Sequence, residues 1–132
     1  MKTDDSKALI LLVEDDSFIS GMYHAKLSNI GYTVEVVENG EAALERLQKA
    51  PVPDVLLLDI VLPKKDGFEV LEEVRADKRL KQLPVLMLTN LGQKPDVERG
   101  IKLGADDYII KAHYTPSEVV EKIEKILNRA GQ

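Results

Sequence analysis

Five short runs of apolar residues recur along the chain, and a longer segment of helical period separates each run from the next. The first run, Ala8–Val13, is continuously apolar, and so is Val55–Leu58. A run without polar alternation is typical of a strand buried on both faces, as in a parallel sheet. The five runs predict strands over residues 8–13, 33–37, 55–58, 85–88 and 108–110.

The intervening segments predict five helices. In the first, apolar residues recur at helical spacing over Ile19–Ile30, and Gly31 is a natural stop. The second is predicted over residues 41–50, where Pro51 and Pro53 end it. The inward positions of the first three helices are Ile19, Met22, Tyr23, Leu27 and Ile30; Ala43, Leu44 and Leu47; and Phe68, Leu71 and Val74.

The last two helices differ in strength. The fourth should begin near Pro95, with Val97 and Ile101 as its best apolar positions. Gly100 inside it costs about 1 kcal/mol relative to alanine. The fifth begins at Thr115–Glu118, which has the spacing of a capping box with proline at the first helical position. Its buried stripe is Val119, Val120, Ile123, Ile126 and Leu127.

Strand–helix units of this kind imply one α/β domain, a parallel sheet with helices on both faces. The formal net charge of −5 disfavours direct binding to nucleic acid, which uses a basic face. Cysteine is absent, which excludes disulfides and thiolate metal sites. No apolar stretch approaches the roughly 20 residues that span a bilayer, and residues 1–7 lack the apolar core of a secretory signal. We therefore expect a cytoplasmic protein without membrane attachment.

Polar side chains follow the predicted strands at the points where they end. Glu14-Asp15-Asp16 follow the first strand, Asp59 the third, Thr89 the fourth and Lys111 the fifth. The carboxyl ends of parallel strands meet at one edge of the sheet, where such folds bind ligands. Crowded carboxylates repel each other unless a cation intervenes, and oxygen ligands without histidine or cysteine suit Mg²⁺.

Each of these residues also has an ordinary explanation. Asp16 could cap the first helix, since acidic residues suit helix N-termini. Asp59 could be a turn residue, Thr89 a strand terminus and Lys111 a solvated surface residue. The combination of carboxylates, hydroxyl and ammonium at one edge favours a functional site.

The sequence resembles the receiver domains of two-component response regulators, in order, spacing and strand placement alike. The resemblance implies a flavodoxin-like, doubly wound sheet of five strands in the order 2-1-3-4-5 with five helices. It implies a receiver domain over residues 8–129, between a flexible tail at 1–7 and a short tail at 130–132. The matching segments are Leu12–Asp16, Leu56–Gly67, Leu88-Thr89 and Gly104–Lys111.

The same resemblance assigns roles to individual residues. Asp59 would accept a phosphoryl group from a sensor histidine kinase, a phosphotransfer protein or a small phosphodonor. Asp15 and Asp59 would bind Mg²⁺ directly, with the backbone carbonyl of Val61 as a third ligand, and Glu14 would act through a coordinated water. Lys111 would pair with Asp59 at rest and with a phosphoryl oxygen afterwards.

A switch completes this interpretation. If the Thr89 hydroxyl moves toward the phosphoryl group, Tyr108 can turn inward and change the surface around the last two helices, to which a downstream protein binds. Tyr108 could instead be an ordinary half-buried aromatic residue. The chain would then be a signalling module, with no enzyme activity beyond its own phosphorylation and dephosphorylation; homodimerisation on phosphorylation is left open.

Departures from the family pattern give further expectations. Alanine follows Lys111 where the family usually has a cis proline, so a trans Lys111–Ala112 bond is expected because a non-proline cis bond costs about 2.5–4 kcal/mol. Val61 and Leu91 are aliphatic and cannot orient an attacking water, which predicts slow self-dephosphorylation. His24 and His113 are expected to be solvated.

Two other functions stay open. The chain could be a receiver module from a larger regulator. It could also be a phosphatase with an aspartyl-phosphate intermediate, like the haloacid-dehalogenase hydrolases, but those need a second aspartate where this chain has Val61.

Overall fold

Side chains alternate along the central strands and divide the core into two layers, one on each face of a five-stranded sheet. The computed structural model describes residues 8–89, 94–111 and 115–130. All four strand pairings are parallel, and the strand order is β2-β1-β3-β4-β5. The predicted flavodoxin-like order is thus confirmed. The elements are β1 (Leu9–Val13), α1 (Ser17–Ile30), β2 (Thr33–Val37), α2 (Gly40–Leu47), β3 (Val55–Leu58), α3 (Gly67–Ala76), β4 (Val85–Thr89), α4 (Lys94–Lys102), β5 (Asp107–Ile110) and α5 (Pro116–Ala130).

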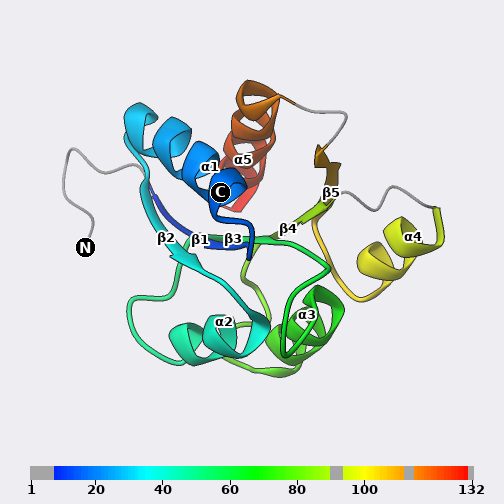
Figure 1. Cartoon of the computed structure of the whole chain (residues 1–132). Helices are drawn as coiled ribbons and strands as arrows, with labels where there is room; N and C mark the ends of the chain where they lie inside the picture. The colour runs from blue at the N-terminus through cyan, green and yellow to red at the C-terminus, as the bar shows by residue number, and fades with distance from the viewer. Residues whose placement is uncertain (1–7, 90–93, 112–114, 131–132) are drawn as a thin grey trace.

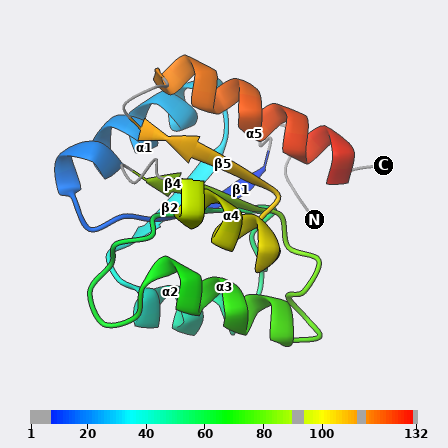
Figure 2. The ribbon, with the colours of Figure 1, turned by 90° about the vertical axis from the view of Figure 1, so that its right-hand side faces the viewer.

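Two pairs of helices cover opposite faces of the sheet (Figure 1). Ile10 and Leu12 of β1 belong to the layer under α1 and α5. Leu11 and Val13 of the same strand belong to the layer over α2 and α3. α4 lies beside β5 at the end of this second layer (Figure 2). The strands β1, β3 and β4 are almost completely buried between these helices, so the polar side chains that follow them lie at the edge where the strands end.

The predicted strands agree with the observed ones to within one residue at each end. The predicted capping box of α5 is also confirmed. The Thr115 N–H donates to Glu118 Oε1 at 2.8 Å, and the Glu118 N–H donates to Thr115 Oγ1 at 3.2 Å. These reciprocal bonds satisfy two amides that a helix N-terminus would otherwise leave without partners.

The predicted end of the second helix is wrong. The sequence indicated a helix to Ala50, but α2 ends at Leu47. Arginine side chains bind the carbonyl groups that follow: Arg79 donates to Leu47 O at 3.0 Å, and Arg46 donates to Lys49 O at 3.0 Å. Because these carbonyls accept hydrogen bonds from arginine side chains, they stay hydrogen-bonded although the helix ends here.

Met22, which was predicted to face inward, and Ile101, one of the best apolar positions of the fourth helix, do not contribute to the core. Met22 of α1 and Ile101 of α4 are both exposed. α1 packs through Tyr23 and Leu27 instead, and α4 through Gly100 and the half-buried Val97. Among the described residues, no helix is long and apolar enough to span a membrane.

Candidate functional site

The first two carboxylates of the site are fixed by the sheet itself. The Glu14 N–H donates to Val37 O at 3.0 Å, and the Asp59 N–H donates to Val13 O at 3.2 Å. These bonds extend the strand ladders one residue beyond β1 and β3, so both residues start from rigid backbone. Glu14 is 2% exposed and Asp59 is 6% exposed. Two acidic residues are therefore buried next to each other at one sheet edge.

Lys111, which follows β5, joins these carboxylates. Its ammonium donates to Asp59 Oδ2 at 3.0 Å and also bonds Glu14 Oε1. The other carboxylate oxygen of Asp59, Oδ1, accepts the Ile60 N–H at 2.7 Å. Pairing of Lys111 with Asp59 agrees with the geometry expected at rest. The direct contact with Glu14 was not predicted from the sequence.

The pKa values of this cluster follow from burial and charge. Burial raises the pKa of the Glu14 carboxyl, and the nearby charge of Asp59 raises it further, while the hydrogen bond from Lys111 opposes both. For Lys111, burial disfavours the ammonium, but the hydrogen bond to Glu14 and the charge of Asp59 outweigh it and raise its pKa. The ammonium therefore stays charged at neutral pH and compensates one of the two buried negative charges.

A third carboxylate opens the cluster to solvent. Oxygen atoms of Glu14, Asp15 and Asp59 all lie within 4.8 Å of one another, and Asp15 is exposed. Three acidic groups against one ammonium leave an excess of negative charge at this point. Hard carboxylate oxygens at this spacing, reachable from water, fit a divalent cation such as Mg²⁺.

Asp16 has a different role. Its Oδ1 accepts the N–H groups of Phe18 at 2.9 Å and Ile19 at 3.2 Å, so it caps α1. Glu14 Oε2 accepts the Asp16 N–H at 3.1 Å. The capping alternative is thus confirmed for Asp16, and the cap also helps to orient Glu14.

The start of α3 approaches the backbone of Asp59 closely. A Cβ atom on Gly67 would lie 2.2 Å from the Asp59 carbonyl oxygen. The Gly67 N–H donates to Ile60 O at 2.7 Å, which folds the intervening loop back on itself. Lys64 in this loop has a φ of 70°, in the left-handed region. The loop places Val61, which is 61% exposed, at the edge of the site.

Thr89 and Tyr108 lie on neighbouring strands and on the same face of the sheet. Met87 pairs with Tyr108, and Thr89 follows two residues later on β4. Both residues are buried, Tyr108 being 8% exposed. The sequence suggested that Tyr108 would turn inward on activation or lie half-buried; the ring is already inside. It packs against Gly100 of α4, where a Cβ would lie 3.4 Å from ring atoms Cδ2 and Cε2.

The sequence interpretation missed an exposed apolar surface on α1. Phe18 is 80% exposed, and Met22, one turn later, is also exposed. Phe18 is the second residue of α1 and lies on the opposite side of the helix from its buried residues. This helical position could have indicated from the sequence that Phe18 is exposed. His24 is exposed, as predicted. Leu91, the Lys111–Ala112 bond and His113 lie outside the described residues.

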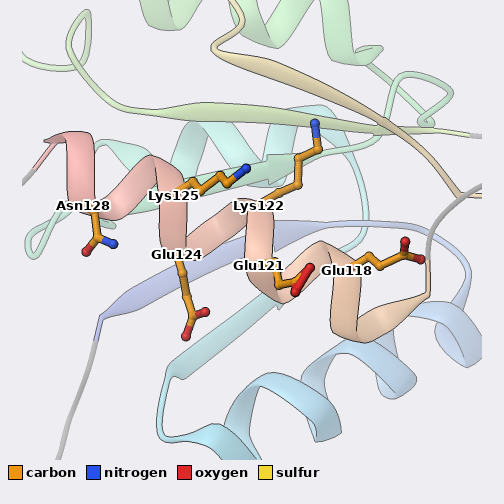
Figure 3. A pocket seen from close by; sticks show the side chains of 6 residues that line it. All are labelled: Glu118, Glu121, Lys122, Glu124, Lys125 and Asn128. Atoms are coloured by element: carbon orange, nitrogen blue, oxygen red, sulfur yellow. The ribbon is translucent and has the colours of Figure 1, made fainter.

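A pocket on α5 is separate from this site. Its lining comes from one helix, and Figure 3 shows Lys122 and Lys125 on one side with Glu124 and Asn128 on the other. The lining carries three glutamates and two lysines, so opposite charges offset one another and provide no concentrated field for an ionic ligand. We assign it no role. The lining residues are Glu118, Glu121, Lys122, Glu124, Lys125 and Asn128.

Comparison with known proteins identifies relatives over nearly the whole chain. The family model of the response regulator receiver domain matches residues 10–124. A protein of Guillardia theta named "probable transcriptional regulator ycf27" is 38% identical over 97% of this chain and 48% of its own length. The DNA-binding dual master transcriptional regulator RpaA of Synechocystis is 39% identical over 93% of this chain and 50% of its own length. The chain thus spans about half the length of the curated relatives it matches.

Solved structures agree with this assignment. A protein from Chloroflexus aurantiacus described as a "putative response regulator" superposes with a TM-score of 0.87 at 35% identity, covering 93% of this chain and 99% of the other. A CheY-like receiver domain protein from Methanospirillum hungatei also gives a TM-score of 0.87, at 28% identity, covering 96% and 98%.

Proposed function

This chain belongs to the response regulator receiver domains, and we propose that it is a phosphorylation switch with Asp59 as the phosphoryl acceptor. The observation that supports this is the buried Asp59 carboxylate, held by Lys111 at 3.0 Å beside Glu14 and Asp15. A carboxylate is a weak nucleophile, but phosphoryl transfer depends mainly on positioning and neutralisation of charge.

In the proposed reaction an oxygen of Asp59 attacks the phosphorus of the donor. A P–O bond to Asp59 forms as the bond from phosphorus to the leaving group breaks. The leaving group is the imidazole of a phosphohistidine or the carboxylate of an acyl phosphate. Lys111 would then move its hydrogen bond from Asp59 to a phosphoryl oxygen, and the Thr89 hydroxyl would donate to another.

Glu14, Asp15 and Asp59, with the backbone carbonyl of Val61, would hold Mg²⁺. When bound, the cation supplies positive charge that offsets the negative charge of the phosphoryl oxygens. The support is the spacing of the three carboxylates and their exposure through Asp15.

We propose that the signal passes through Thr89 and Tyr108. Both are buried on one face of the sheet, so a shift of Thr89 toward the phosphoryl group changes the packing beside Tyr108. Because the Tyr108 ring already packs against Gly100, the change would reach the surface as a displacement of α4. A downstream protein that binds there would detect the displacement.

The proposed phosphodonor is a sensor histidine kinase or a phosphotransfer protein, in the cytoplasm. The exposed apolar side chains of Phe18 and Met22 on α1 favour a protein donor, because α1 begins directly after the acidic residues of the site. We propose no enzyme activity beyond the protein's own phosphorylation and dephosphorylation.

Intact mass after incubation with Mg²⁺ and acetyl phosphate tests the acceptor. One added phosphoryl group is expected in the wild type and none in Asp59→Asn. Asp77→Asn, which removes a carboxylate at the far end of α3, is the control and should be phosphorylated normally. An unmodified wild type, or a modified Asp59→Asn, would refute the assignment.

A second candidate is a receiver module that acts within a larger regulator. The named transcriptional regulators it matches are about twice as long as the matched segment. The sequence of the complete gene would decide between this and a receiver that acts without an output domain.

A further inference from the structure

Arg75, in the last turn of α3, connects three segments at the sheet edge opposite the carboxylates. Its guanidinium donates from Nε to Gly104 O at 2.9 Å and from Nη1 to Leu83 O at 2.7 Å. Nη2 donates to Asp106 Oδ2 at 3.1 Å, and the same oxygen accepts the Val85 N–H at 2.8 Å. A planar guanidinium can bond several fixed acceptors at once, which a lysine ammonium does poorly. We call this set of contacts the Arg75 clamp.

The clamp holds the turn that ends α4. Gly104 has a φ of 110°, and its N–H donates to Ile101 O at 3.0 Å. The Ala105 N–H donates to Gly100 O at 2.9 Å, which completes a Schellman motif. A Cβ atom on Gly104 would lie 2.9 Å from Arg75 Nε. Glycine is therefore required here both by the backbone conformation and by the approach of Arg75.

Tyr108 of β5 contacts α4 between the two ends of that helix. α4 can therefore act as a lever that pivots at its C-terminal turn. Tyr108 contacts Gly100, which is four residues, or about 6 Å, from Gly104 along the helix axis. Lys94, the first residue of α4, is about 15 Å from Gly104 along the same axis. If Gly104 stays in place, a displacement imposed at Gly100 grows about 2.5-fold at Lys94.

We infer that Arg75 is a positioning residue of the switch: it fixes the C-terminal end of α4, so that a change at Tyr108 moves the N-terminal end. The role rests on the proposed function of Asp59. The clamp itself lies at the start of β4, roughly 13 Å along that strand from Thr89. Arg75 therefore acts on the movement and not on the acceptance of the phosphoryl group.

A weaker contact ties the lever to α3 and can break as it moves. The guanidinium of Arg99 lies 4.3 Å from the centroid of the Phe68 ring. Arg99 is exposed, and a cation–π contact in water is weak compared with several hydrogen bonds from a partly buried guanidinium.

Amide hydrogen exchange of the unphosphorylated protein tests the clamp. Arg75→Gln should speed exchange of the Leu103, Gly104, Ala105 and Asp106 amides by about tenfold. Arg46→Gln is the matched control, because Arg46 likewise binds one carboxylate and backbone carbonyls, but it joins α2 to Glu35 of β2 and does not contact the end of α4. It should leave those four amides within about twofold of the wild type. Equal protection of the four amides in both variants would overturn the clamp.

Backbone amide chemical shifts before and after phosphorylation test the lever. In the wild type the changes should be larger over residues 94–98 than over 103–106. In Arg75→Gln they should extend through 106, while the gain in mass at Asp59 is unchanged. The same distribution of changes in both proteins would overturn the positioning role. A wild type that gains no mass would instead refute the proposed function of Asp59, and the exchange comparison would still decide whether the clamp exists.

Discussion

At the scale of single residues, Lys111 determines whether two acidic groups can be buried together. Its ammonium contacts both Glu14 and Asp59, and all three side chains are nearly inaccessible to water. A buried ion pair adds little net stability compared with an apolar pair, but loss of one partner leaves a charge without compensation. The effect of removing Lys111 should therefore be large, although the pairing itself is not a major source of stability.

Lys111→Met should lower the free energy of unfolding by about 3 kcal/mol at neutral pH in the presence of a chelator. Adding Glu14→Gln should restore part of this loss, because one uncompensated carboxylate is removed. Urea unfolding of the two single variants and the double variant measures the coupling. Lys122→Met is the control: its ion pair with Asp107 at 2.9 Å is partly exposed, so at most about 1 kcal/mol should be lost. Equal effects of both lysine substitutions would contradict this account.

Tyr108 should make stability depend on pH in the alkaline range. Burial, followed by the charges of Asp96 and Asp59, raises the pKa of the Tyr108 phenol to about 12. The folded state favours the neutral phenol, so this stabilisation is complete below pH 10 and is lost as the pH rises through 12. Tyr108→Phe should lose stability less steeply over this range, as measured by denaturant unfolding at several pH values. An unchanged slope would show that the phenol ionises as it does in water.

Val61 should control how long the phosphoryl group remains. Its exposed side chain lies at the edge of the site and offers no hydrogen bond to an attacking water. Val61→Asn should accelerate loss of the phosphoryl group by roughly three- to tenfold, less than the 10²–10⁴ of a fully positioned general base. Val36→Asn, at an exposed valine of β2, should leave the rate unchanged. If both variants lost the phosphoryl group at the same rate, Val61 would not control its lifetime.

At the scale of elements, the packing of α3 against β3 sets the position of Asp59. Gly67→Ala would place a methyl group 2.2 Å from the Asp59 carbonyl, which only a shift of backbone can relieve. We expect a loss of about 2 kcal/mol in stability and slower phosphorylation. Gly21→Ala on α1 is the matched control, since a Cβ there meets no atom within 4 Å. It should stabilise the protein by about 0.5–1 kcal/mol. The same unfolding and mass measurements test both variants.

The elements show what the sequence could and could not predict. Continuous apolar runs such as Val55–Leu58 predicted the strands, because a parallel sheet buries both faces of each strand. The end of α2 depends on Arg79, which is distant in sequence and binds Leu47 O. Met22 was counted with the predicted apolar stripe, but it lies one turn from the exposed Phe18, on the face of α1 that the rest of the protein leaves uncovered. Periodicity gives the direction of a side chain but not how far the neighbouring elements cover it.

The candidate site, too, could be predicted from the sequence only in part. That Glu14, Asp59 and Lys111 share one sheet edge follows from parallel topology, and the sequence predicted it. The contact between Lys111 and Glu14 depends on side-chain conformation in a crowded space, which no pattern encodes. The Arg75 clamp was not foreseen because its acceptors are mostly backbone carbonyls, which carry no sequence signature.

At the scale of the whole molecule, the two ends of β4 carry separate tasks. Thr89 at one end belongs to the proposed chemistry, and Val85 at the other end is tied through Asp106 to the Arg75 clamp. α4 lies beside β5, the strand next to β4 (Figure 2). Chemistry at one edge can thus change the outer surface while the opposite edge stays fixed.

The acidic cluster should also link the stability of the whole protein to Mg²⁺. Glu14, Asp15 and Asp59 repel one another in the folded state, and the unfolded chain does not hold them together. A cation that binds only the folded state stabilises it by RT ln(1 + [L]/Kd), or about 1.4 kcal/mol at ten times Kd. For a domain of this size that corresponds to a rise in Tm of about 5 °C.

Thermal unfolding in EDTA and in increasing MgCl₂, with ionic strength kept constant by NaCl, measures this linkage. Asp15→Asn should remove the rise in Tm with Mg²⁺. It should also raise the Tm in EDTA slightly, because it relieves part of the repulsion between the carboxylates. Asp66→Asn is the control, because Asp66 caps α3 and is not in the cluster, so its Tm should still rise with Mg²⁺. If the wild type and Asp15→Asn respond equally to Mg²⁺, the cation binds elsewhere, and only Lys111 offsets the charges of Glu14 and Asp59.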